Sequence, residues 1–208
     1  TIAIPINDDP TTLLGWKLRN SNEQVIQPII YEFLMKYDAT GKPQPYLLES
    51  AVENPEELTY TLVVRDGITF QDGTVLDAEA VKWNLDNYKE KGVLSASYFS
   101  KVDNVEVKDS KTVVVHMTEW DSQFLYGLAR ICAICSPTAV KELGEEGFNE
   151  KPVGTGPFMV KEWKHGEGIY TVRYDNYWQG KPYLDGVNIL KYATTATQQA
   201  ALQAGDLD

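Results

Sequence analysis

The chain has 208 residues, enough for one large domain or two small ones with a hydrophobic core. Its 43% hydrophobic and 24% charged residues are typical of a soluble globular protein, and no apolar run reaches the roughly 20 residues that span a bilayer. The formal net charge of -11 repels phosphate backbones and anionic lipid headgroups, which argues against nucleic acids and membrane surfaces as partners.

The N-terminal region predicts a strand followed by a helix. Residues 1–6 (TIAIPI) alternate like a strand and end at a turn cluster, NDDP. After a polar stretch, apolar residues recur at three- and four-residue spacing from Val25 to Phe33, which predicts a helix with one buried face. Three residues are candidate caps for its start: Asn20, Ser21 and Asn22.

Residues 38–150 change character and indicate a separate α+β unit. The alternating strand in ELTYTLVVRDG leads to a hairpin signal at Asp66-Gly67, after which ITFQDGT predicts a second strand. Asp77 is the predicted cap of the next helix. A further hairpin turns at Asp109-Ser110, a short helix covers DSQFLYGLAR, and another helix starts at Ser136-Pro137.

The two cysteines of the chain stand in the segment RICAICSP. Cys132 and Cys135 alternate with apolar residues, which predicts a buried strand carrying two small apolar thiols. A redox pair or a metal role is the alternative, and a redox pair would need an exposed thiol with a lowered pKa. The two histidines stand far apart and add no ligand cluster.

The segment from residue 154 onward predicts strand, turn and strand in FMVKEWK, HGEG and IYTVRYD. A loop rich in Asn, Gly and Pro follows, and then the strand GVNILKYA and the helix TQQAALQA. Gly205 stands where a C-terminal helix cap is expected.

The Gly-x-Gly of KPVGTGPF (151–158) raises the question of a phosphate site. A phosphate loop needs glycines that lead into a helix N-terminus, whereas these lead into a predicted strand, with no Lys-Ser/Thr at Walker spacing. A nucleophile elbow needs Gly-x-Ser-x-Gly, and only Thr155 stands here. We therefore interpret the glycines as structural, permitting a backbone path that other residues would find strained.

The acidic residues do not predict an active site. They fall mostly in turns, such as Asp66 and Asp109, or on helix faces, so no pair of carboxylates stands out for acid–base chemistry. The residues thus predict an α/β protein that is not an enzyme. A secreted acidic hydrolase is an alternative for which the sequence offers no catalytic group.

Several segments together resemble one family. KPVGTGPFMVKEWKHGEGIYTVRYDNYWQGKPYLDGVNI closely resembles the signature region of the bacterial extracellular solute-binding proteins of the peptide/nickel-binding type, where GTGPF/Y, NxxYW and GKPYLD recur at this spacing. YEFLMKYDATGKPQPYLLES, TYTLVVRDGITFQDGTVLDAEAVKWNLD and ALQAGDLD are similar to further segments of that family. The resemblance extends over nearly the whole chain.

The resemblance implies a periplasmic-binding-protein-like α/β fold of type II, a mixed sheet with flanking helices. Family members have two lobes that close on the ligand and are more than twice as long as this chain. The chain is expected to be a fragment that lacks the second lobe. Residues 1–37 and 151–208 would form the core of the first lobe, and residues 38–150 an inserted α+β subdomain.

The resemblance also implies a function. The protein is expected to be the substrate-binding component of an ABC importer that captures a short peptide outside the cytoplasmic membrane and delivers it to the permease subunits. A nickel-chelate or other small polar solute is the alternative ligand. We expect a monomer in the periplasm or, as a lipoprotein, on the cell surface, touching the membrane only through a lipid anchor or permease docking. No cofactor is expected.

The resemblance places six candidate ligand-binding residues in the cleft: Trp16, Arg19, Asn22, Gln24, Tyr98 and Arg130. The nickel-binding branch has an aromatic residue and a methionine at the positions of Arg19 and Gln24, and an arginine at that of Arg130. Its Arg and Trp near Ser97 are absent here. Each candidate has a structural alternative: Arg19 as a solvated loop charge, Arg130 as a cation at a helix C-terminus, and Trp16 and Tyr98 as packing residues.

Overall fold

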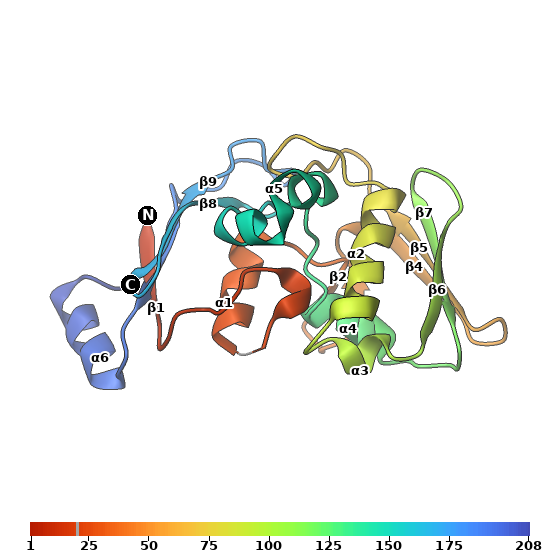
Figure 1. Cartoon of the computed structure of the whole chain (residues 1–208), viewed down its shortest axis with the longest axis horizontal. Helices are drawn as coiled ribbons and strands as arrows, with labels where there is room; N and C mark the ends of the chain where they lie inside the picture. The colour runs from red at the N-terminus through yellow and green to blue at the C-terminus, as the bar shows by residue number, and fades with distance from the viewer. Residues whose placement is uncertain (20) are drawn as a thin grey trace.

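Two four-stranded sheets stand at opposite ends of the molecule, with helices between them (Figure 1). The computed structural model describes residues 1–19 and 21–208. The sheet near both termini has the order β1 (Ile2–Ile6), β10 (Val187–Lys191), β9 (Gly168–Arg173) and β8 (Phe158–Lys164). Strand β1 pairs with β10 in parallel and the other pairs are antiparallel, which is the mixed sheet that the family resemblance implied.

The second sheet is antiparallel throughout. Its order is β4 (Leu48–Asn54), β5 (Thr59–Val64), β7 (Thr112–Met117) and β6 (Val102–Val107), and helix α2 (Ala78–Lys91) lies against β6 and β7. The short hairpin of β2 (Met35–Tyr37) and β3 (Pro43–Pro45) contacts α4 (Phe124–Arg130), which in turn contacts α3 (Ala96–Phe99). The predicted division into 1–37 with 151–208 and an inserted 38–150 stays a prediction.

The remaining helices are η1 (Gly15–Lys17), α1 (Ser21–Ile30), α5 (Pro137–Glu150) and α6 (Thr195–Ala204). Three predicted helix ends are confirmed: Asp77 Oδ1 accepts from Ala80 N at 2.9 Å, Ser136 Oγ accepts from Ala139 N at 3.1 Å, and Gly205 has a left-handed φ of 81°. Of the candidate caps for α1, Asn20 and the side chain of Ser21 lie outside the described residues.

Two predicted strands are wrong. After Asp66-Gly67 the segment 68–76 leaves the sheet and folds on itself through a bridge between Thr69 and Val75. Segment 131–135 forms an isolated bridge, Phe33 with Ala133, instead of a strand. In both segments the alternation of apolar residues reflects insertion into the core between helices, which periodicity alone does not distinguish from a strand.

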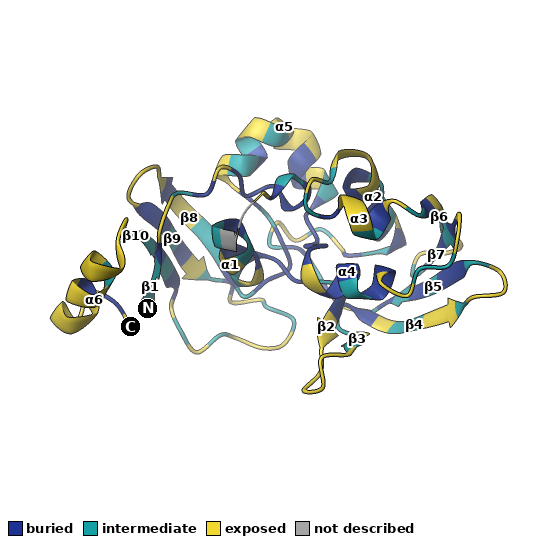
Figure 2. Ribbon diagram, turned by 90° about the horizontal axis from the view of Figure 1, so that it is seen from below, coloured by how far each residue is buried: buried dark blue, intermediate teal, exposed yellow. Residues whose placement is uncertain are grey.

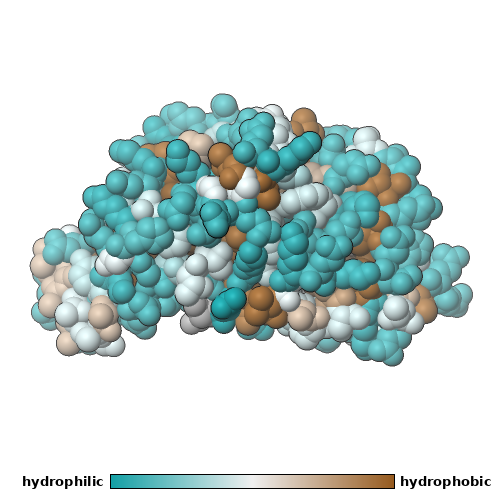
Figure 3. Space-filling model, in the orientation of Figure 1, coloured by the Kyte–Doolittle hydropathy of each residue, from teal (hydrophilic) through white to brown (hydrophobic). Residues whose placement is uncertain are grey.

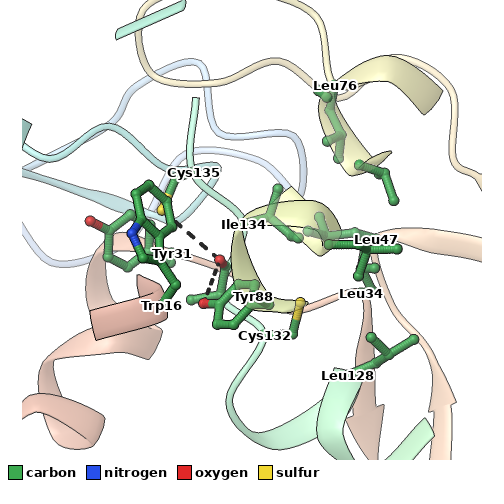
Figure 4. Packing of buried hydrophobic residues seen from close by; sticks show 14 of the residues in the cluster. Trp16, Tyr31, Leu34, Leu47, Leu76, Tyr88, Leu128, Cys132, Ile134 and Cys135 are labelled. Carbon is green, nitrogen blue, oxygen red and sulfur yellow. Dashed lines mark hydrogen bonds between the residues drawn. The ribbon is translucent and has the colours of Figure 1, made fainter. Parts of the chain in front are cut away.

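Both cysteines are buried and free (Figure 4). They lie among core residues that include Tyr31 and Tyr88, and Tyr88 donates to Ala133 O at 3.0 Å. The main chain of Cys135 is held by Asn84, whose amide accepts from Cys135 N and donates to Cys135 O, each at 2.9 Å. The prediction of two buried apolar thiols is confirmed.

We expect these thiols to resist labelling in the native protein. Burial raises the pKa of Cys135 to about 12 and that of Cys132 well above its usual value, so almost no thiolate is present at pH 8. Ellman's reagent should react with both only after denaturation, whereas a control cysteine introduced at the exposed turn residue Ser122 should react at once. Fast labelling of either native thiol would contradict this packing.

The Gly-x-Gly segment crosses the end of α1 at contact distance. A Cβ on Gly156 would lie 2.6 Å from Ile30 O and one on Gly154 would lie 2.4 Å from the same atom. Gly156 N donates to Ile30 O at 3.0 Å, and the Gln71 amide donates to Ile30 O and to Gly156 O. The glycines are structural as predicted, but the reason differs: neither has a positive φ, and what they provide is room for the backbone.

Glu32, a buried carboxylate after α1, forms a junction between two further segments of the chain. Its Oε1 accepts from Tyr46 Oη at 2.7 Å and from Tyr177 Oη at 2.5 Å, and its Oε2 accepts from Trp178 Nε1 at 2.7 Å. Burial, followed by the hydrogen bond to Glu32, raises the pKa of Tyr46 to about 12, so this hydroxyl remains a donor. Glu32 therefore ties the segment leading into β4 to the loop after β9.

Candidate functional site

The segment between β1 and α1 is folded tightly around the first turn of α1. Thr11 donates to Glu23 Oε1 through its N–H at 3.0 Å and its hydroxyl at 2.6 Å, and Arg19 N donates to Glu23 Oε2. Glu23 is itself buried. This frame holds Arg19 at the start of α1.

The predicted site residues of this segment differ in their exposure. The Arg19 side chain is exposed, Gln24 is half-buried, and the Asn22 amide donates to Asp8 O at 3.3 Å. Trp16 is different: its side chain is 1% exposed and packs edge-on against Trp83, with ring centroids 5.4 Å apart. The structure therefore places Trp16 in the core, beneath the surface that the other residues reach.

An aromatic group surrounds the C-terminal end of α4. Tyr98 of α3 packs directly on Gly127, where a Cβ would lie 2.7 Å from the Tyr98 Cβ atom. Tyr37 of β2 donates to Tyr126 O at 3.2 Å, and their rings lie 6.1 Å apart. Arg130 ends α4 and is exposed. Partial burial, followed by the neighbouring Tyr98, raises the pKa of Tyr37, and the charge of Arg130 opposes this shift.

These two regions adjoin through buried neighbours. Gly15, Trp16 and Leu18 lie around one packing gap with Leu94, Ser95 and Ile131, and the gap is too small to hold a water molecule. Leu18 precedes Arg19 and Ile131 follows Arg130, so each arginine is next in the chain to a residue of this gap. Helices α1, α3 and α4 all reach the lower face of Figure 1, which Figure 2 shows from below.

Two of the arginine side chains on this face make no hydrogen bond or ion pair with the described residues. Of the four arginines in the chain, Arg65 donates to main-chain oxygens and Arg173 pairs with two aspartates. The side chains of Arg19 and Arg130 have no hydrogen-bond or ion-pair partner within residues 1–19 and 21–208. In a chain with an excess of acidic residues, two exposed guanidinium groups without a partner among the described residues, one of them near the Tyr37 hydroxyl, are suited to bind carboxylates.

The site offers binding groups rather than reactive ones. Within the described part of the chain, His, Cys, Asp and Glu side chains form no group that could hold a metal ion. None of the described helices has the length and apolar character that a membrane crossing requires. Sequence reasoning missed Tyr37, because its proximity to Arg130 depends on the β2–α4 contact and no local pattern marks it. It also missed Tyr126, although Tyr126 lies four residues before Arg130 in the same helix and helical spacing could have placed the two side by side.

The family model of the bacterial extracellular solute-binding proteins, family 5 (middle part), matches residues 42–208. The chain belongs to this family. Its membership and its type II periplasmic-binding-protein fold agree with the resemblance seen in the sequence.

Individual relatives extend the match to the whole chain. The glutathione-binding protein GsiB of Shigella flexneri is 32% identical over 99% of this chain and 41% of its own length. The oligopeptide-binding protein AppA of Bacillus subtilis, solved with a nonapeptide, superposes with a TM-score of 0.90 at 29% identity, covering 100% of this chain and 43% of AppA. A nickel ABC transporter structure from Bacillus halodurans has a TM-score of 0.86 at 28% identity, covering 100% and 42%.

The chain thus spans about two fifths of the length of these family 5 relatives. As a family 5 protein it belongs to a group of solute-binding proteins, which are transport components rather than enzymes.

Proposed function

We propose that this family 5 protein is the substrate-binding component of an ABC importer and that it captures a short peptide. The observation that carries the proposal is the pair of exposed arginines, Arg19 and Arg130, which have no hydrogen-bond or ion-pair partner within residues 1–19 and 21–208 and are chain neighbours of two residues that share a packing gap. A peptide brings at least one carboxylate, and Arg binds carboxylates in a planar, bidentate geometry. The relatives named for glutathione and for a bound nonapeptide support the same ligand class.

Of the six proposed ligand-binding residues, five contact the ligand and one packs beneath them. Arg19 and Arg130 bind ligand carboxylates, Asn22 and Gln24 offer polar groups from the first turns of α1, and Tyr98 presents its ring beside Arg130. Trp16 is buried beneath these residues, where it packs against Trp83, and it does not touch the ligand. Binding is non-covalent and is completed by closure of a second lobe.

The proposed biological setting goes beyond the family match, which supports a solute-binding role. The protein works outside the cytoplasmic membrane, in the periplasm or as a lipoprotein on the cell surface, and delivers its ligand as a monomer to the permease subunits. Residues 1–37 and 151–208 act as the core of one lobe and residues 38–150 as its inserted subdomain.

Arg130→Ala should weaken peptide binding about 10- to 100-fold, because a charge-assisted hydrogen bond contributes about 1.5 to 3 kcal/mol. The measurement is isothermal titration calorimetry on the protein in its full natural length, with glutathione and with the tripeptide Ala-Leu-Ala. Lys141→Ala, which removes an exposed cation from α5, is the matched control and should leave the affinity unchanged. Failure of the wild-type protein to bind either peptide would overturn the proposed function.

A nickel-chelate ligand is the second candidate, favoured by the likeness to the nickel transporter structure and by the exposed, unpaired Arg130. Because the described residues form no metal-binding group, a small carboxylate chelator would have to hold the metal. Heat released with nickel plus histidine or citrate, but with neither peptide, would select this candidate.

A further inference from the structure

A groove of about 460 Å³ lies where α2 and α5 begin, beside the turn at residues 72–75. Helix α2 has 14 residues, about 21 Å at the usual rise per residue, and runs from this groove to the end that contacts α3 (Figure 1). None of the six proposed ligand-binding residues lines the groove. Its lining residues are Thr74, Val75, Asp77, Glu79, Ala80, Trp83, Pro137 and Thr138.

Hydrogen bonds fix the walls of the groove. Asp72 Oδ1 accepts from Thr74 N at 2.9 Å and from Thr74 Oγ1 at 2.6 Å, and Asp72 Oδ2 accepts from Ser136 Oγ at 2.5 Å. Ser136 in turn caps α5. Asn84 of α2 makes two hydrogen bonds to the main chain of Cys135, which precedes Ser136. The turn and both helix ends are therefore held in place without a bound partner.

The groove offers apolar surface on a face that is otherwise mostly hydrophilic. In the orientation of Figure 1, this face shows only small separate hydrophobic patches (Figure 3). Val75 is 60% exposed, although its main chain is fixed by the bridge to Thr69. The half-buried Trp83 packs edge-on against the buried Trp16 and also lines the groove. An exposed valine close to an indole ring is a suitable surface for the methylene stem of a long side chain.

Both charged residues that line the groove are acidic. Glu79 is exposed in the first turn of α2 and has no hydrogen-bond or ion-pair partner in the described part of the chain. Lys82, one turn further along α2, pairs with Asp86 at 2.7 Å instead of with Glu79. The positive ends of α2 and α5 offset about half an elementary charge each, which is less than the charge of Glu79 and Asp77 together. The groove therefore keeps a negative charge.

We propose that this groove docks the permease subunits of the importer by taking up a lysine or arginine side chain from one of their extracytoplasmic loops. The methylene stem of that side chain packs on Val75 and Trp83. Its charged head pairs with Glu79 and Asp77. The inference rests on the proposed importer function and adds a docking surface to it.

Charge complementarity selects this occupant. A groove with two carboxylates and no basic lining residue attracts a cationic partner and repels an acidic one, and a second copy of this chain carries a net charge of -11. The position of the groove fits the same role. Because it lies at the other end of α2 from α3, closure of a second lobe over the proposed ligand face leaves the groove open to a partner.

The test uses the protein in its full natural length and its permease complex, purified and placed in lipid nanodiscs. Biolayer interferometry measures docking, and calorimetry with glutathione and Ala-Leu-Ala measures peptide affinity separately. Glu79→Lys should weaken docking about 10-fold or more, because it puts a like charge opposite the incoming cation. Val75→Ser should weaken docking about 3- to 10-fold through lost apolar contact. Unchanged peptide affinity is expected for both variants and shows that they are folded.

Two matched controls lie outside the groove. Glu90→Lys makes the same charge reversal at the other end of α2, and Val52→Ser makes the same apolar-to-polar change on β4, where Val52 is 58% exposed. Both controls should dock like the wild-type protein. Added salt should weaken docking of the wild-type protein but not that of Glu79→Lys, since salt screens attraction between exposed charges.

The outcomes separate the two proposals. If the wild-type protein docks and both groove variants dock equally well, the docking surface is overturned and the proposed function stands. If a groove variant weakens peptide binding as much as docking, its effect is general, which also overturns the docking surface. If Glu79→Lys abolishes binding of N-acetylarginine amide but leaves docking unchanged, the groove takes a small cation instead.

The wild-type protein alone tests the proposed function. If it binds neither peptide, the proposed peptide capture fails, whereas the docking measurement still tests the groove. If it binds peptide but does not dock to the permease complex, the importer role and the docking surface both fail.

Discussion

Gly156→Ala is expected to destabilise the protein by about 2 to 4 kcal/mol, because it places a methyl group where the main chain of α1 already lies. The added Cβ would meet Ile30 C and Ile30 O, each at 2.6 Å, and Tyr31 N at 3.0 Å. All three are backbone atoms, so no side-chain rotation can relieve the overlap. Separating the two segments would also break the hydrogen bond from Gly156 N to Ile30 O. Urea unfolding of the full-length protein, followed by tryptophan fluorescence, measures the loss.

Gly147→Ala is the matched control for this prediction. Gly147 lies in α5, and its added Cβ would meet only the Leu143 Cβ atom, at 3.2 Å, a contact that a shift of a few tenths of an ångström relieves. Alanine is favoured over glycine in helices by about 1 kcal/mol, so this variant should unfold at nearly the wild-type urea concentration. Equal midpoints for Gly156→Ala and Gly147→Ala would show that the close crossing at Ile30 is not present.

Glu32→Ala is expected to cost about 3 to 5 kcal/mol, because one carboxylate satisfies three donors around a buried position. Its removal leaves Trp178 Nε1 without its acceptor, and the hydroxyls of Tyr46 and Tyr177 keep only each other at 3.3 Å and, for Tyr46, the Gln179 amide. Each buried donor left without a partner costs about 1 to 3 kcal/mol. The same urea titration measures the effect.

Two further variants make the Glu32 prediction specific. Glu32→Gln keeps the size and one acceptor oxygen but adds a donor, so it should fall between wild type and alanine. Glu49→Ala removes an exposed carboxylate from β4 and should be almost neutral. If Glu32→Ala were as mild as Glu49→Ala, the cluster around Glu32 would not contribute to the junction.

Short-range patterns predicted much of the fold. Asp77, Ser136 and Gly205 mark helix ends correctly, because a cap is a contact between residues three or four positions apart and the local sequence contains both partners. The motif spacing also predicted the family, which the family model confirms. Local patterns were wrong for segments 68–76 and 131–135, where alternating apolar residues fill a core between helices instead of joining a ladder.

In the candidate site, too, the sequence identified individual residues but not the contacts between distant parts of the chain. The sequence named Arg19 and Arg130, yet it could not show that their neighbours Leu18 and Ile131 share a packing gap, or that neither arginine has a partner among the described residues, since both facts depend on residues more than a hundred positions apart. Burial of Trp16 against Trp83 was equally hidden, and so was the packing of Tyr37 and Tyr98 around α4.

By itself, the sequence determined the class of fold, most helix ends, the burial of the cysteines and the family, because each is encoded in local spacing or in contiguous motifs. Only the tertiary structure decided why the Gly-x-Gly segment needs glycine, what Glu32 holds, and which charges remain unpaired. The physical reason is that backbone clearance and charge pairing are set by atoms that the fold brings together from distant parts of the chain.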